Sequence, residues 1–228
     1  MSRSIEAIVF DLDGTLIDSV PDVCAAINRA LAAASLGAVA LDDVRGMVGW
    51  GARVMLEKAV AAAAPGALAL SDVAMARLVD SYLGFYRQEP ALRTLIYPGV
   101  IEVLEKLTAE GVLMGVCTNK PHAMTTVVLD ALDMTQFFRG IAGADAVPFR
   151  KPDARHVHHT IGLMGAEGRA AVMVGDSETD MAAGRNAGLP VIAVTYGYAH
   201  GAADALDADI RIDRFDALPA ALEQLCQG

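Results

Sequence analysis

Two acidic residues, Asp11 and Asp13, follow a short apolar run near the start of the chain and are themselves followed by a glycine. Carboxylates this close repel each other unless a cation or a reaction intermediate compensates for their charge. A carboxylate at the tip of a strand can attack a phosphorus atom and form an aspartyl phosphate. A second carboxylate two residues further on can protonate the leaving alcohol and later deprotonate the attacking water. We therefore expect Asp11 to be a nucleophile and Asp13 a general acid and base.

Three more polar clusters follow later in the chain, namely Thr118-Asn119-Lys120, Arg150-Lys151-Pro152 and Gly175-Asp176-Ser177-Glu178-Thr179-Asp180. The Thr118 hydroxyl, the Asn119 amide and the Lys151 ammonium group would supply donors and positive charge to a phosphoryl group in transfer. Asp11, Asp13 and Asp176 together offer hard oxygen donors, which suit Mg²⁺. The four clusters predict a magnesium-dependent phosphoryl transfer.

The residues around Asp176 are expected to support the site from an outer layer, to which we assign Gly175, Ser177 and Asp180. Gly175 lets the backbone turn tightly or approach a phosphate. Three roles remain open for Asp180, which are a ligand near the metal, a partner that holds Lys151, or a negative charge in the first turn of a helix. Of these, we favour the outer role.

Short apolar runs that alternate with helical patterns would position these clusters. Strands are expected at residues 7–10, 113–117, 171–174, 191–194 and 210–212, and helices at 100–109, 123–132, 154–163, 179–186 and 218–226. Nearly continuous apolar strands are typical of a parallel sheet that is covered on both faces. Ligands of such sheets bind beyond the carboxyl ends of the strands. The pattern predicts a doubly wound, Rossmann-like α/β core with all four clusters at one edge.

One segment interrupts this alternation. From about residue 21 to residue 89 the sequence has helical periodicity, with a break at Gly49-Trp50-Gly51 and no convincing strand. We therefore expect an all-helical domain over residues 17–92, inserted into an α/β core of residues 1–16 and 93–228.

Composition excludes several classes of protein. The 228 residues are 54% hydrophobic and carry a net charge of −10, which argues against a broad electrostatic interface with nucleic acid. Three cysteines without a C-x-x-C spacing argue against a disulfide framework. The N-terminus does not resemble a secretory signal, and the most apolar tract is too short to span a bilayer. We expect a cytoplasmic protein, a monomer or homodimer, whose partner is a small anionic phosphorylated metabolite and neither nucleic acid nor a membrane.

Some residues suggest chemistry but have simpler explanations. His156, His158 and His159 are expected at the surface, because no nearby carboxylate or cysteine completes a zinc set. Cys117 is expected to be a small core residue. Trp50 would either line the site or pack between helices of the insertion.

The motif Asp11-Leu12-Asp13-Gly14-Thr15-Leu16, with Thr118-Asn119, Lys151-Pro152 and residues 175–180, resembles the haloacid-dehalogenase superfamily of phosphatases over nearly the whole chain. The resemblance implies that Asp11 is the nucleophile and Asp13 the acid and base. It further implies that Asp11, the backbone carbonyl of Asp13 and Asp176 hold Mg²⁺, that Thr118, Asn119 and Lys151 contact phosphate, and that the helical insertion is a cap domain.

Within the superfamily, residues 44–53 and 195–201 resemble the phosphoglycolate phosphatases. This resemblance implies hydrolysis of 2-phosphoglycolate to glycolate and phosphate. Candidate substrate contacts in the cap are Gly49, Trp50, Gly51 and Arg53, of which Arg53 could bind the substrate carboxylate. The alternatives are a phosphatase for a sugar phosphate or pyrophosphate, and a phosphoglucomutase-type isomerase. A dehalogenase is disfavoured, because carbon–halogen hydrolysis needs neither Asp13 nor the metal ligands.

Overall fold

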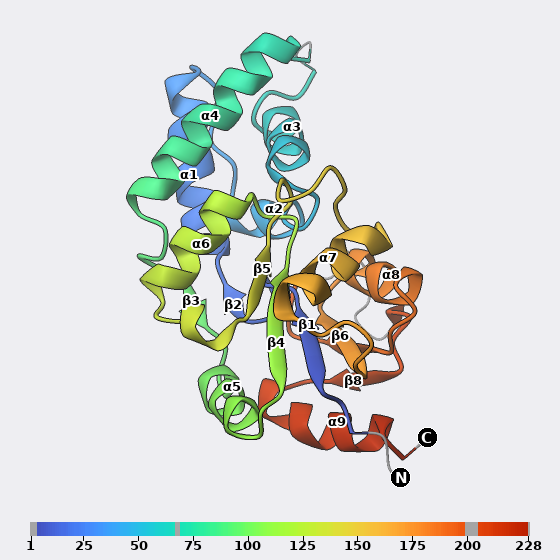
Figure 1. Cartoon of the computed structure of the whole chain (residues 1–228). Helices are drawn as coiled ribbons and strands as arrows, with labels where there is room; N and C mark the ends of the chain where they lie inside the picture. The colour runs from blue at the N-terminus through green and yellow to red at the C-terminus, as the bar shows by residue number, and fades with distance from the viewer. Residues whose placement is uncertain (1–3, 67–68, 199–204, 228) are drawn as a thin grey trace.

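The computed structural model describes residues 4–66, 69–198 and 205–227, and within them a central parallel sheet holds six strands in the order β5-β4-β1-β6-β7-β8 (Figure 1). These strands are β1 (Ala7–Phe10), β4 (Leu113–Cys117), β5 (Gly140–Ala142), β6 (Ala171–Gly175), β7 (Val191–Val194) and β8 (Ile210–Ile212). Every neighbouring pair is parallel, and β1 lies between β4 and β6. The carboxyl ends of these three strands therefore meet at one edge of the sheet.

Helices cover both faces of this sheet. They are α5 (Val100–Ala109), α6 (His122–Ala131), α7 (Ala154–Met164), α8 (Glu178–Asn186) and α9 (Leu218–Leu225), with short 3₁₀ helices at Thr135–Phe137 and Phe215–Ala217. Alternate residues of β1 belong to different hydrophobic clusters: Ile8 and Phe10 belong to the one that contains residues of α5, α6 and α9, whereas Ala7 and Val9 belong to the one that contains residues of α7 and α8. All four are fully buried, which explains why the strand has no polar position. The predicted doubly wound α/β core is confirmed.

A helical segment separates β1 from the rest of the sheet. It contains β2 (Ile17–Asp18), α1 (Val20–Ala33), α2 (Leu41–Arg45), α3 (Ala52–Ala63), α4 (Asp72–Gln88) and β3 (Leu95–Ile96). Helices α1 and α3 pack on α4, and the segment lies above the carboxyl edge of the sheet (Figure 1). Because β2 and β3 pair in antiparallel fashion, the chain leaves the core and returns to it side by side. The division into a core and a cap at residues 17 and 92 stays a prediction.

One expectation about the histidines is corrected by the fold. His156 is fully buried in α7 and not at the surface, whereas His158 is exposed. The buried face of α7 also contains Val157, Thr160 and Ile161, so the histidine faces the sheet with them. No helix in the described part of the chain is both long and apolar enough to cross a bilayer.

Candidate active site

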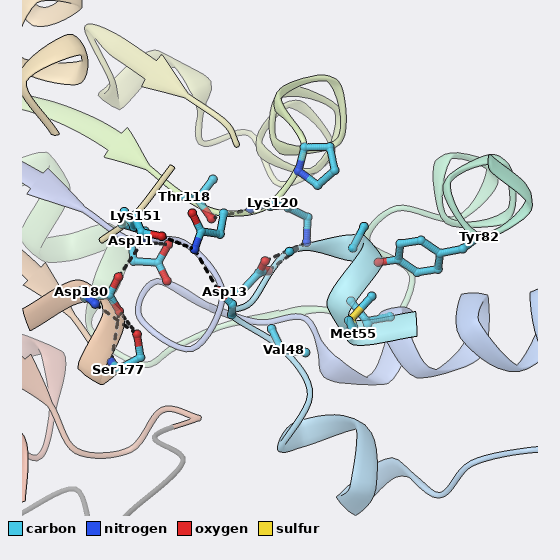
Figure 2. A pocket seen from close by; sticks show the side chains of 16 residues that line it. Asp11, Asp13, Val48, Met55, Tyr82, Thr118, Lys120, Lys151, Ser177 and Asp180 are labelled. Carbon is cyan, nitrogen blue, oxygen red and sulfur yellow. Dashed lines mark hydrogen bonds and ion pairs between the residues drawn. The ribbon is translucent and has the colours of Figure 1, made fainter. Parts of the chain in front are cut away.

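A pocket lies where the carboxyl edge of the sheet meets the helical segment (Figure 2). From the core it is lined by Asp11, Asp13, Thr118, Asn119, Lys120, Pro121, Lys151, Ser177 and Asp180. From the helical segment it is lined by Val23, Val48, Gly49, Gly51, Ala52, Met55 and Tyr82. All four predicted clusters thus contribute to one pocket or its immediate support.

Lys151 joins two buried carboxylates. Its Nζ lies 2.7 Å from Asp11 Oδ1 and 2.5 Å from Asp180 Oδ1, and the residue is 3% exposed. Burial alone would lower the pKa of Lys151, but the negative charges of Asp11 and Asp180 outweigh it and raise that pKa above its usual value. The ammonium group therefore stays charged beside the expected nucleophile.

Three buried carboxylates, those of Asp11, Asp176 and Asp180, have oxygens within 4.8 Å of one another. Burial raises the pKa of Asp11 to about 6, because the loss of water and the charge of Asp180 outweigh the attraction of Lys151. Burial, and then the charges of Asp180 and Asp11, also raise the pKa of Asp176 well above its usual value. A buried set of hard oxygen donors whose charge is not fully compensated fits a divalent cation such as Mg²⁺.

Asp180 uses both of its oxygens within the protein. Oδ1 contacts Lys151, and Oδ2 accepts hydrogen bonds from the backbone nitrogens of Asp176 (3.2 Å) and Ser177 (3.1 Å) and from the Ser177 hydroxyl (2.6 Å). Ser177 in turn caps α8 by accepting from Asp180 N. A Cβ atom on Gly175 would lie 2.3 Å from Asp180 Cβ, so this close approach requires glycine. Asp180 therefore ties Lys151 to the Asp176 loop.

Asp176 is oriented by two residues that sequence reasoning missed. Thr15 Oγ1 donates to Oδ1 at 3.0 Å, and Tyr198 N donates to Oδ2 at 2.6 Å. The Tyr198 hydroxyl also donates to Asp18 and accepts from Ser19 N, which links the Asp176 side chain to the start of the helical segment. Tyr198 belongs to the 195–201 stretch singled out in the sequence, of which residues 199–201 lie outside the described residues.

Asp13 points away from the three-carboxylate cluster and has its own partners. Ser19 Oγ donates to Oδ1 at 2.5 Å, and Lys120 Nζ lies 2.9 and 3.0 Å from the two oxygens. Lys120 also donates to the Tyr86 hydroxyl of α4 at 2.9 Å. Lys120 is a site residue for which the sequence suggested no role, although it directly follows Thr118 and Asn119.

Thr118 and Asn119 are buried at the pocket, and Thr118 Oγ1 and Asn119 Nδ2 already have partners, whereas Asn119 Oδ1 has none among the described residues. Asn119 Nδ2 donates to the carbonyls of Gly49 (3.1 Å) and Lys151 (3.2 Å), so both amide hydrogens are used. Thr118 Oγ1 accepts from Lys120 N. In this structure, Asn119 therefore holds the helical segment against the Lys151 loop.

The predicted cap residues separate into two groups. Gly49 and Gly51 line the pocket, whereas Trp50 and Arg53 are not part of its lining. Trp50 is 39% exposed and lies under the Lys58 ammonium group. Arg53 forms ion pairs with Glu57 and Asp72 at the surface, and its binding of the substrate carboxylate stays a prediction. The prediction for Cys117 is confirmed, since the residue is fully buried and burial raises its pKa to about 12.

Comparison with known proteins agrees with this arrangement. The family model described as haloacid dehalogenase-like hydrolase matches residues 8–194. The chain is 42% identical over 224 residues to a protein of Mesorhizobium japonicum named phosphoglycolate phosphatase, with 98% of this chain and 96% of that protein covered. It is 43% identical over 215 residues to a protein of that name from Caulobacter vibrioides, with 94% and 89% covered.

A solved structure supports the same relationship. The crystal structure of a predicted phosphoglycolate phosphatase from Haemophilus somnus superimposes with a TM-score of 0.88 at 30% identity, and 95% of this chain and 97% of that one are covered. The family model matches the chain from β1 to β7, a range that includes all described lining residues of the pocket. The chain belongs to the haloacid dehalogenase-like hydrolases.

Proposed function

We propose that this hydrolase is a magnesium-dependent phosphatase that converts 2-phosphoglycolate to glycolate and phosphate through an aspartyl phosphate on Asp11. The observation that carries the proposal is the different surroundings of the two carboxylates at the end of β1. Asp11 lies in the three-carboxylate cluster beside Lys151, whereas Asp13 lies on the side of the helical segment, with Ser19 and Lys120. The relatives named phosphoglycolate phosphatase support the choice of substrate.

The two carboxylates divide the chemistry between them. An oxygen of Asp11 attacks phosphorus, the bond from phosphorus to the leaving oxygen breaks, and Asp13 gives that oxygen a proton, so that glycolate leaves. Asp13 then takes a proton from a water molecule. The resulting hydroxide attacks the phosphorus, the bond to Asp11 breaks, and phosphate leaves. Lys151 compensates negative charge on the phosphoryl oxygens throughout.

The remaining polar residues hold these groups in position. Asp11, Asp176 and the backbone carbonyl of Asp13 would hold Mg²⁺, which when bound neutralises charge between the carboxylates and the phosphate. Thr118 and Asn119 would contribute donors near the phosphate, and Gly175, Ser177 and Asp180 would fix the loop that holds Asp176. Residues 17–92 would form the cap over a core of residues 1–16 and 93–228.

A substrate panel tests the proposal. The purified protein with Mg²⁺ is assayed for phosphate release from 2-phosphoglycolate, sugar phosphates, pyrophosphate and p-nitrophenyl phosphate, with Asp11→Asn as the inactive control. We expect 2-phosphoglycolate to give the highest kcat/KM. A higher value for a sugar phosphate or pyrophosphate would assign a different hydrolytic substrate. Dependence on a sugar bisphosphate with little phosphate release would favour the phosphoglucomutase-type alternative.

A further inference from the structure

The pocket has two cationic side chains among its described lining residues, and they lie on different sides of Asp13. Lys151 is paired with Asp11 and Asp180, on the side where the phosphoryl group would bind. Lys120 is paired with Asp13, on the side where the leaving group would bind. A substrate with a phosphate at one end and a carboxylate at the other needs one cation on each side.

Lys120 is held at a fixed point between the core and the helical segment. The residue is 8% exposed and follows β4, while Tyr86, which accepts from its Nζ at 2.9 Å, is a buried residue of α4. Lys120 Nζ also contacts the two oxygens of Asp13, at 2.9 and 3.0 Å, and lies over the Tyr86 ring. An ammonium group held from both sides loses little conformational freedom when it binds a further anion.

The surroundings of Lys120 on the leaving-group side are largely apolar, apart from the hydroxyl group of Tyr82. Val48, Met55 and Tyr82 line this part of the pocket, and Figure 2 shows them on the side of Asp13 away from Asp11. A carboxylate that enters here loses water, and burial of a charge without a partner is costly. Lys120 is the described cation that can compensate that loss within the lining.

The chemistry of 2-phosphoglycolate puts its carboxylate within reach of this lysine. One methylene separates the leaving oxygen from the carboxylate carbon, so a group that contacts Asp13 also lies close to the carboxylate. We propose that Lys120 is the specificity-determining residue that binds the substrate carboxylate, an inference that rests on the proposed function. We place this role on Lys120 and not on Arg53, because Lys120 lines the pocket and Arg53 does not.

A comparison of two matched substrates distinguishes binding of the substrate carboxylate by Lys120 from a role in which Lys120 only positions Asp13. The substrate 2-hydroxyethyl phosphate has the same carbon skeleton as 2-phosphoglycolate, with a hydroxymethyl group in place of the carboxylate. For Lys120→Met, we expect the ratio of kcat/KM for 2-phosphoglycolate over 2-hydroxyethyl phosphate to fall about 10- to 100-fold, the range of one charged hydrogen bond. Lys120→Arg should recover part of the ratio. The control Lys58→Met changes an exposed lysine of α3 outside the lining and should leave the ratio unchanged.

Each outcome supports or overturns the inference. If the wild type does not prefer 2-phosphoglycolate, the proposed function itself fails, and this inference fails with it. If the wild type prefers it but Lys120→Met lowers kcat/KM for both substrates by the same factor, only the inference is overturned, and Lys120 merely positions Asp13. A fall in the ratio for Arg150→Ala and not for Lys120→Met would assign the carboxylate to Arg150, an exposed residue near Gly51.

A second variant covers the case in which Lys120→Met does not fold. Tyr86→Phe keeps the lysine and removes one group that holds it. We expect KM for 2-phosphoglycolate to rise several-fold, while KM for 2-hydroxyethyl phosphate stays the same. An equal change in both KM values would overturn the inference.

Discussion

Asp22 accepts hydrogen bonds from both the backbone nitrogen and the hydroxyl of Thr94 through a single oxygen, Oδ2, at 2.7 and 2.8 Å. The same oxygen accepts from Arg93 N at 2.8 Å. Asp22 lies in the first turn of α1, and Thr94 immediately precedes β3. One buried carboxylate therefore joins the segment that leaves the core to the segment that returns to it, beside the ladder of β2 and β3.

Asp22→Asn should destabilise the protein by about 1–3 kcal/mol, because the three donors lose a charged acceptor and a buried N–H₂ group is introduced. The measurement is the free energy of unfolding from urea titrations of the variant and the wild type. The control is Asp80→Asn, at an exposed position of α4, where we expect a change within about 0.5 kcal/mol. Equal stabilities of the two variants would show that the Asp22 contacts contribute nothing.

Removal of divalent metal should abolish turnover, because the buried carboxylates of Asp11 and Asp176 need a cation to compensate for their charge. After EDTA treatment, Mg²⁺ should restore phosphate release, whereas Ca²⁺ should restore it poorly, since Ca²⁺ takes more ligands at longer distances. Mg²⁺ should also raise the melting temperature of the wild type, because it binds the folded state alone. This rise should shrink in Asp176→Asn. Full activity in EDTA would contradict the expectation.

Substitutions of the two carboxylates that follow β1, Asp11 and Asp13, should impair different steps of the reaction. Asp11→Asn should abolish formation of the phosphoenzyme, because it removes the nucleophile. Asp13→Asn should still form it from p-nitrophenyl phosphate, whose leaving group needs little protonation, but should break it down slowly. Single-turnover release of p-nitrophenol measures the first step separately from the second. Total loss of the burst in both variants would argue against separate roles.

The sequence predicted those parts of the fold that rest on local pattern. Strands β1 and β4 are runs of four and five residues that are buried on both sides, so their apolar pattern is continuous. Strand β5 was missed because it has three residues and begins with Gly140, where a Cβ atom would lie 2.8 Å from Leu163 Cβ. Strands β2 and β3 have two residues each, and their pairing depends on where the chain returns.

The sequence predicted those site residues whose type, at that point of a motif, is typical of one kind of chemistry. Asp11 and Lys151 carry such signals, and the structure brings them together. Lys120 contacts Asp13 and the Tyr198 hydroxyl contacts Asp18, each more than 100 residues away, and a lysine or tyrosine has no pattern that reveals such a partner. The buried position of His156 had a signal in the sequence, because the apolar residues Val157 and Ile161 lie beside it at helical spacing on the same face of α7.

His156 provides a pH-dependent contribution to stability. Its Nε2 lies 3.1 Å from the carbonyl oxygen of Gly143, which requires the proton on Nε2, and the buried Nδ1 has no hydrogen-bond partner among the described residues. Protonation would add a second N–H at this buried nitrogen and a positive charge to a buried ring. Burial, and then the positive charge of Lys151, lower the pKa of His156 to about 4. In the unfolded chain the pKa is about 6.5.

As the pH falls from about 6.5 to about 4, the unfolded chain binds a proton at His156 that the folded protein does not bind, so the stability should decrease. The decrease attributable to this residue should approach ~3 kcal/mol. His156→Gln keeps a donor toward Gly143 but does not titrate. The difference in unfolding free energy between wild type and variant should therefore move in favour of the variant between pH 7 and pH 4, while contributions from other groups cancel. Urea titrations across this range measure it, and a constant difference would mean that His156 is not held neutral by its burial.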